Sequence, residues 1–132
     1  MDQFMGTWKL TASENFDEYM KAVGISFASR QIANLAKPSL LFSDDQGLIS
    51  MKSTTTFKTV EIKFRLDEEF DEITADDRQA KTVMRLVDGK LIQTQTWAGK
   101  STTIEREVQG GKLILKCIMD GVVCTRTYER DE

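Results

Sequence analysis

The stretch STTIEREVQGGKLILKCIMDGVVCTRTYER, residues 101–130, decides the fold. Its residues alternate with a period of two in three successive runs, which predicts three β-strands. Gly110-Gly111 and Asp120-Gly121 separate the runs, and both dipeptides favour two-residue hairpin turns. Short hairpins between consecutive strands indicate an antiparallel up-and-down meander.

Two arginines fall in one row of this meander. If both hairpins have two-residue loops, Arg106, Leu115 and Arg126 lie side by side on three adjacent strands. The Cα atoms of the arginines are then about 10 Å apart, twice the spacing between strands. Tyr128 follows on the same face, whereas Glu105 belongs to the opposite, solvated face. We therefore expect both arginines to point into the interior.

The chemistry of this row leaves two readings open. A buried guanidinium needs an anion or a set of acceptors, because an isolated buried charge is very unfavourable. Both arginines either pair with internal carboxylates or bridge water, or they hold the carboxylate of a bound ligand. The apolar residues on the same face suit an amphipathic ligand with a long apolar tail.

The same register predicts further neighbours. Cys117 faces Cys124, and the turn at Ala98-Gly99 places Gln93 and Gln95 on the inward face. We expect the two cysteines to stay reduced, because a cytosolic compartment keeps thiols reduced. Because the two cysteines face each other on neighbouring strands, a cross-strand disulfide remains an alternative.

The remaining sequence predicts seven more strands and two short helices. Apolar residues recur with helical spacing only from Asn15, a candidate N-cap, to about residue 36, with Gly24 interrupting the run. We expect helices over 16–23 and 27–35. The strand-like runs lie near 5–13, 39–44, 48–54, 57–65, 70–74, 79–87, 90–97, 101–109, 112–119 and 122–130. A ten-stranded meander hides its edges best by closing into a barrel. The expected fold is all-β: one domain over 1–132, a ten-stranded antiparallel up-and-down β-barrel capped by a helix-turn-helix.

Composition excludes several classes of function. The 132 residues contain no histidine, which removes histidine bases, triads and metal ligands. Two cysteines are too few for a four-thiolate zinc site. The net charge of −3 argues against a general nucleic-acid binder. The first residues carry no secretory pattern and no apolar run is long enough to span a membrane, so we expect a cytosolic protein. The acid-rich segment 65–78 is expected to be a solvated edge.

Eight short motifs are spread over the chain: GTWKL (6–10), NFDEYM (15–20), AKP (36–38), STTTFK (53–58), EFDE (69–72), TADDR (74–78), TTI (102–104) and CTRTYER (124–130). In combination these motifs resemble the intracellular lipid-binding proteins, also called cytosolic fatty-acid-binding proteins. The similarity covers the whole chain and is closest to the heart, adipocyte, epidermal and peripheral-myelin branch.

The resemblance implies a flattened barrel that binds a long-chain fatty acid, such as palmitate or oleate, in an internal cavity. It implies a carrier without a cofactor and without catalysis. In this branch an Arg-x-Tyr pair takes the carboxylate, which corresponds to Arg126 and Tyr128, with Arg106 nearby. Together with the inward positions of the strands, the candidates for contact with the tail and the portal are Phe16, Tyr19, Met20, Ile25, Ala33, Pro38, Phe57, Ala75, Asp76, Arg78, Gln95, Ile104, Leu115 and Cys117.

The helix pair carries basic residues that suggest a membrane contact. Lys21, Arg30 and Lys37 lie on or beside the expected helices. We expect transient contact with anionic membranes during fatty-acid transfer. The protein is expected to be a monomer that binds no nucleic acid, located in the cytoplasm and also in the nucleus.

Three alternatives stay open. Retinoic acid or another hydrophobic carboxylate would satisfy the same arginines. A membrane-associated lipid-binding protein of the myelin type is a second alternative, against which the acidic balance and Gln31, at a position that is usually basic, both argue. The third is a hydrolase, for which no histidine or nucleophile accompanies the candidate acids Glu68, Glu69, Asp71 and Glu72.

Overall fold

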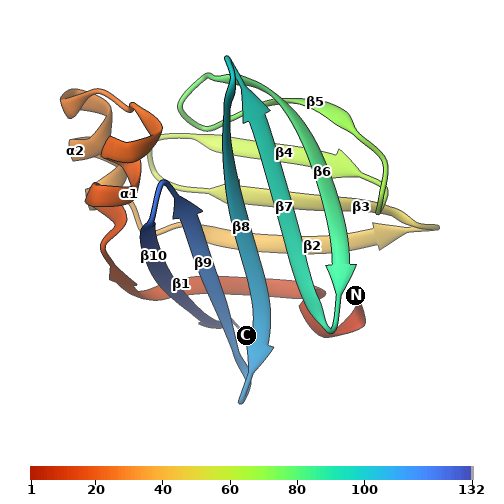
Figure 1. Ribbon diagram of the computed structural model, residues 1–132. Helices are drawn as coiled ribbons and strands as arrows, with labels where there is room; N and C mark the ends of the chain where they lie inside the picture. Colours follow the sequence, from red (N-terminus) through yellow and green to blue (C-terminus); the bar gives the residue numbers. More distant parts are fainter. Residues whose placement is uncertain (132) are drawn as a thin grey trace.

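The computed structural model describes residues 1–131, in which ten strands and two α-helices follow the order expected from the sequence, after a short 3-10 helix that was not predicted (Figure 1). Every expected strand and helix is present, and each boundary lies within two residues of the prediction. The elements are η1 (Asp2–Phe4), β1 (Gly6–Glu14), α1 (Phe16–Val23), α2 (Phe27–Leu35), β2 (Ser39–Asp45), β3 (Leu48–Thr54), β4 (Thr59–Phe64), β5 (Phe70–Ile73), β6 (Gln79–Val87), β7 (Lys90–Trp97), β8 (Lys100–Gln109), β9 (Lys112–Met119) and β10 (Val122–Arg130).

The strands form one antiparallel sheet that curls into a nearly closed barrel (Figure 1). Neighbours follow the order β4-β3-β2-β1-β10-β9-β8-β7-β6-β5, so the first and last strands meet where β1 pairs with β10. The edges of the sheet are β4 and β5. Between them the rings of Phe64 and Phe70 stack with their centroids 6.1 Å apart. The expected flattened barrel with a helical cap is confirmed.

Two-residue turns set the register of the last strands. Asp120 and Gly121 have φ of 50° and 80°, and Gly110 and Gly111 have φ of 56° and 79°. Two successive residues with positive φ are the signature of type I′ turns, which match the twist of a hairpin. The predicted row is therefore confirmed: Leu115 pairs with Arg126 on one side and with Arg106 on the other.

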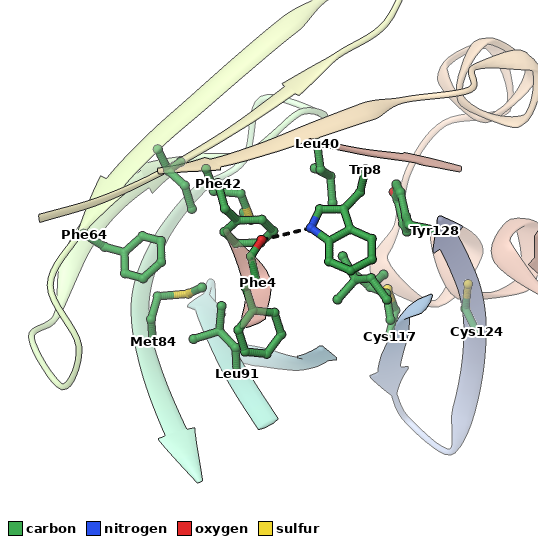
Figure 2. Packing of buried hydrophobic residues seen from close by; sticks show 14 of the residues in the cluster. Phe4, Trp8, Leu40, Phe42, Phe64, Met84, Leu91, Cys117, Cys124 and Tyr128 are labelled. Carbon is green, nitrogen blue, oxygen red and sulfur yellow. Dashed lines mark hydrogen bonds between the residues drawn. The ribbon is translucent and has the colours of Figure 1, made fainter. Parts of the chain in front are cut away.

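Large apolar side chains fill part of the barrel (Figure 2). Trp8 is fully buried, and its Nε1 donates to the carbonyl of Phe4 over 2.9 Å. Phe42 packs against Phe4 with ring centroids 6.0 Å apart. Met84 and Leu91 on β6 and β7 are also completely buried. These residues supply much of the hydrophobic free energy, since apolar burial stabilises by about 25 cal/mol per Å².

The two helices are anchored differently. α1 ends at Gly24, whose φ of 100° suits a glycine C-cap, and it buries Tyr19, Met20 and Val23. α2 buries none of its residues. Within residues 1–131 no helix is long and apolar enough to cross a membrane.

Asn15 differs from the expected helix cap. It occupies the N-cap position of α1 with φ of 66°, but its side chain makes no capping hydrogen bond. Instead, Asn15 Nδ2 donates to the carbonyl of Val123 over 3.1 Å. The side chain thus ties the start of α1 to β10.

Truncation of Phe64 should destabilise the barrel strongly. Phe64 is 2% exposed and stacks on Phe70 at the edge of the sheet, so Phe64→Ala should lower the free energy of unfolding by about 3–5 kcal/mol. Phe57→Ala makes the same chemical change at a side chain that is 56% exposed and should change it by less than about 0.5 kcal/mol. Urea unfolding followed by tryptophan fluorescence measures both. Equal losses would contradict the role given to Phe64.

Candidate functional site

The predicted row places two guanidinium groups in the interior. Arg106 on β8 is 5% exposed and Arg126 on β10 is 6% exposed. Tyr128, two residues beyond Arg126, is also buried. Burial raises the pKa of Tyr128, although the charge of Arg126 and a hydrogen bond with it act in the opposite direction. The phenol is therefore neutral at physiological pH and can donate a hydrogen bond.

Arg126 has polar and aromatic neighbours but no carboxylate partner among residues 1–131. Its Nη1 donates to Ser13 Oγ over 3.1 Å, and its Cζ lies 3.8 Å from the centroid of the Phe16 ring. A hydroxyl and a ring face stabilise a cation without neutralising it. This buried positive charge therefore suits an anionic ligand.

A bulge in β1 supplies the hydroxyl. The pairing of β1 with β10 shifts by one residue between Leu10 and Ala12, so that Ser13 lies opposite Arg126. Without the shift Ala12 would occupy that position. The bulge thus gives Arg126 an acceptor that a regular strand would not provide.

Arg106 is held differently. Its Nη1 donates to Gln93 Oε1 over 2.9 Å, and Gln93 Nε2 donates to Glu72 Oε1 over 3.0 Å. Burial lowers the pKa of Arg106, and nearby acidic groups that include Glu72 oppose this shift. The Arg106 Nε atom is buried and finds no acceptor within the part of the chain that the structure describes. One amide group therefore separates Arg106 from a carboxylate.

Glu72 corrects the expectation that segment 65–78 is a solvated edge. Its side chain is buried, and its Oε1 accepts hydrogen bonds from Thr82 over 2.8 Å and from Gln95 over 3.0 Å, besides the one from Gln93. Glu68, Glu69 and Asp71 are exposed. The four acids that a hydrolase was considered to use are therefore not brought together. The sequence carried one signal for this acid. Gln93 and Gln95 on β7 were both predicted to point inward, and their amide groups need a buried hydrogen-bond acceptor.

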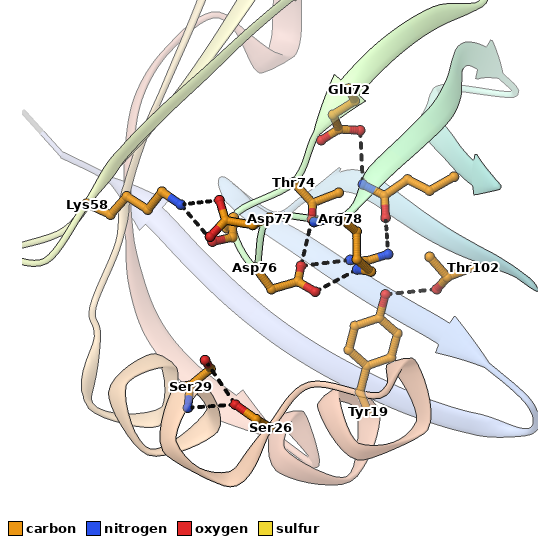
Figure 3. Close-up of polar contacts among 12 residues, drawn as sticks. Tyr19, Ser26, Ser29, Lys58, Glu72, Thr74, Asp76, Asp77, Arg78 and Thr102 are labelled. Carbon is orange, nitrogen blue, oxygen red and sulfur yellow. Dashed lines mark hydrogen bonds and ion pairs between the residues drawn. The ribbon is translucent and has the colours of Figure 1, made fainter. Parts of the chain in front are cut away.

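An ion pair within the β5–β6 turn joins Asp76 and Arg78 (Figure 3). Arg78 Nε donates to Asp76 over 2.6 Å, and the guanidinium lies 4.3 Å from the Trp97 ring centroid. The side chains are only 17% and 18% exposed, so this pair is shielded from solvent more than an ordinary surface ion pair. Burial raises the pKa of Asp76, but hydrogen bonds from Arg78 and Thr74 outweigh it and the pKa is lowered overall.

Tyr19 ties α1 to the barrel close to this pair (Figure 3). Its hydroxyl lies 2.8 Å from Thr102 Oγ1, which in turn donates to the carbonyl of Ile118. Burial raises the pKa of Tyr19 to about 12, so the phenol stays neutral.

The other candidates for tail and portal contact divide by burial. Those that lie inside or under the cap are buried or half-buried: Phe16, Met20, Ile25, Ala33, Pro38, Gln95, Ile104, Leu115 and Cys117. Phe57 and Ala75 are exposed, in the β3–β4 and β5–β6 turns. Lys58 Nζ donates to the carbonyl of Ala75 over 3.0 Å and links the two turns. Phe57 therefore belongs to the rim of the barrel rather than to its interior.

The two cysteines face each other across β9 and β10 as the register predicted. Both are free thiols. A hydrogen bond with Cys124 and burial raise the pKa of Cys117 well above its usual value. Cys117 is therefore a neutral side chain on the inward face.

The basic residues of the cap are mostly paired. Lys21 Nζ lies 3.2 Å from Glu18 and 3.5 Å from Asp17, and Arg30 Nε lies 3.1 Å from Asp17. Lys37 is exposed and makes no ion pair within residues 1–131. Lys37 is thus the least compensated cation of the three.

Apolar side chains are exposed on the same cap. Phe27, Ile32 and Leu35 on α2 are at least half exposed to solvent. A helix that presents several large apolar side chains to water is a candidate for contact with an apolar surface.

Comparison with known proteins identifies the family. Residues 5–131 match the model of the lipocalin / cytosolic fatty-acid binding protein family. The fatty-acid-binding protein 1 of Echinococcus granulosus is 40% identical, with a TM-score of 0.97 and full coverage of both chains. A Schistosoma mansoni fatty acid binding protein, solved in complex with arachidonic acid, is 38% identical with a TM-score of 0.96, over 100% of this chain and 98% of that one.

A more distant relative shares the same architecture. Lipid binding protein 8 of Caenorhabditis elegans is 31% identical with a TM-score of 0.95, over 99% of this chain and 97% of that one. Each of these comparisons covers at least 99% of this chain. This chain therefore belongs to the lipocalin / cytosolic fatty-acid binding protein family.

Proposed function

We propose that this chain is a non-catalytic carrier that binds a long-chain fatty acid such as palmitate or oleate inside the barrel. The carboxylate is held by Arg126 and Tyr128, with Arg106 nearby. The observation that carries the proposal is the buried Arg126 charge, which has a hydroxyl and an aromatic ring beside it but no carboxylate partner among residues 1–131. A fatty-acid carboxylate would neutralise that charge and accept hydrogen bonds from the guanidinium and the phenol.

The two ends of the ligand have different roles in this proposal. Burial of about 15 methylene groups at about 0.8 kcal/mol each gives roughly 12 kcal/mol before entropic costs. The tail therefore supplies most of the affinity, and the arginine selects an anionic headgroup and fixes the orientation. The fatty-acid-binding relative that was solved with arachidonic acid supports the assignment of the ligand class.

The proposal includes the cellular setting. We propose a monomer in the cytoplasm and also in the nucleus, which needs no cofactor and binds no nucleic acid. The protein touches anionic membranes transiently through its cap, where exposed Phe27 and Leu35 would enter the lipid interface and Lys37 would meet the anionic headgroups.

Removal of the Arg126 charge should weaken binding of an acid more than binding of an alcohol. Arg126→Gln should lower the affinity for oleic acid by about 2 kcal/mol, roughly 30-fold, because one partner of a desolvated charge pair is lost. Oleyl alcohol brings no charge, so its affinity should change less or rise. Calorimetric titration at neutral pH measures both. Arg85→Gln removes an exposed arginine and should leave both affinities within about twofold.

An equal loss of affinity for the acid and for the alcohol in a folded Arg126→Gln protein would contradict the headgroup assignment. Competition between retinoic acid and oleic acid in the same titration separates the fatty-acid carrier from a retinoic-acid carrier. Preference for retinoic acid would move the proposal to that other apolar carboxylate.

Transfer of a fluorescent fatty acid to vesicles should depend on collision with the membrane. The rate should rise with vesicle concentration and with the fraction of anionic lipid. It should fall at high salt, since the Debye length shortens from about 10 Å at 0.1 M to about 3 Å at 1 M. Lys37→Glu should lower the rate on anionic vesicles, whereas Lys112→Glu, an exposed change on β9, should not. A transfer rate that does not change with vesicle concentration or with lipid charge would contradict membrane contact.

A further inference from the structure

The charges inside the barrel do not balance without a ligand. Within residues 1–131, the buried Asp, Glu, Lys and Arg side chains are Glu72, Arg106 and Arg126, whose formal charges sum to one positive charge. The pKa values of Tyr19 and Tyr128 are raised, so both phenols stay neutral and do not alter the sum. One negative charge on a bound ligand would therefore neutralise the interior.

Glu72 is connected to Arg106 and not to Arg126. Gln93 donates from its amide nitrogen to Glu72 over 3.0 Å and accepts at its amide oxygen from Arg106 over 2.9 Å. Because an amide has a donor end and an acceptor end, this orientation suits an acid on one side and a cation on the other. Arg126 has its contacts with Ser13 and Phe16 instead.

The hydrogen bonds at Glu72 suit a carboxylate. Thr82, Gln93 and Gln95 all donate to Oε1, and none of these contacts uses the carboxyl group as a donor. Gln95 also connects Glu72 to Arg78, because its amide nitrogen donates to Glu72 over 3.0 Å and its amide oxygen accepts from Arg78 over 3.5 Å. Arg78 is already neutralised by Asp76, however, so the charge of Glu72 remains available to Arg106.

We propose that Glu72 is the counter-ion of Arg106, acting through Gln93, and that this pairing leaves Arg126 as the one uncompensated charge, so that the interior selects singly charged over doubly charged lipid anions. The proposal rests on the proposed function and adds its specificity. Glu72 acts as a positioning and charge-balancing residue, since it does not itself touch the ligand in this arrangement. A second negative charge on the ligand would not be offset, because Glu72 already compensates Arg106 through Gln93.

The first test compares hexadecanoate with hexadecyl phosphate by displacement of a fluorescent probe at pH 7.4. A phosphate monoester carries about −1.5 to −2 charges at this pH. Wild-type protein should prefer hexadecanoate. Glu72→Gln, which keeps the size and an acceptor oxygen, should shift the ratio of affinities toward the phosphate by about tenfold or more. Glu69→Gln removes an exposed acid of the same segment and should leave the ratio within about twofold.

The second test is a double-mutant cycle between Glu72 and Arg106. Arg106→Gln alone leaves Glu72 unbalanced inside the barrel, so it should lower both the melting temperature and the affinity for hexadecanoate. Adding Glu72→Gln should restore most of both losses. If either single variant does not fold, recovery of a folded protein in the double variant supports the pairing as well. The cycle thus gives a readout even when binding cannot be measured in a single variant.

These results distinguish the inference from the proposed function. If wild-type protein does not bind hexadecanoate, the carrier function is wrong. If it binds hexadecanoate but accepts hexadecyl phosphate equally well, the selectivity is wrong. If the double variant is as unstable and as weak as Arg106→Gln alone, Arg106 contacts the ligand directly and Glu72 is not its counter-ion.

Discussion

Two guanidinium groups inside a β-barrel are the constraint on which the rest of this structure depends. Desolvation of a charge is too unfavourable to leave either arginine without partners. Arg106 reaches Glu72 through one amide, whereas Arg126 has a serine hydroxyl, the face of Phe16 and the neighbouring Tyr128. Only the first arrangement contains an opposite charge. This asymmetry between two otherwise similar arginines is what supports the headgroup site that we propose at Arg126.

Two hairpin turns and one bulge in the backbone set this arrangement. The β8–β9 and β9–β10 turns have positive φ at both central residues, which fixes the register of three strands. A slip by one residue would exchange the two faces and move Arg106 and Arg126 to the solvent. The bulge in β1 has a complementary effect, because it moves Ser13 into the position opposite Arg126. Turn geometry and one irregularity thus determine which polar groups meet in the interior.

The sequence predicted the parts that follow from regular geometry. Asp120-Gly121 and Gly110-Gly111 allowed the row of Arg106 and Arg126 to be derived, because a two-residue turn determines every pair along a hairpin. Glu72 was missed because β5 inverts the usual pattern. Ile73 is exposed while Glu72 is buried, so alternation of polar and apolar residues indicates the wrong face. The bulge in β1 was also missed. A register shift of this kind depends on tertiary packing, and no residue type in β1 indicates it.

The helical cap combines a fixed part with a loosely held one. α1 packs against β9 and β10, buries Met20 and Val23, and contributes the Phe16 ring to Arg126. α2 packs on α1, buries no residue and is held through the ion pair of Arg30 with Asp17. Local opening costs least where few apolar contacts are lost. Displacement of α2 therefore exposes little apolar surface, whereas displacement of α1 would also remove the aromatic partner of Arg126. The function proposed above, in which an apolar chain enters the barrel while Arg126 holds the headgroup, requires this division between a loosely held α2 and a fixed α1.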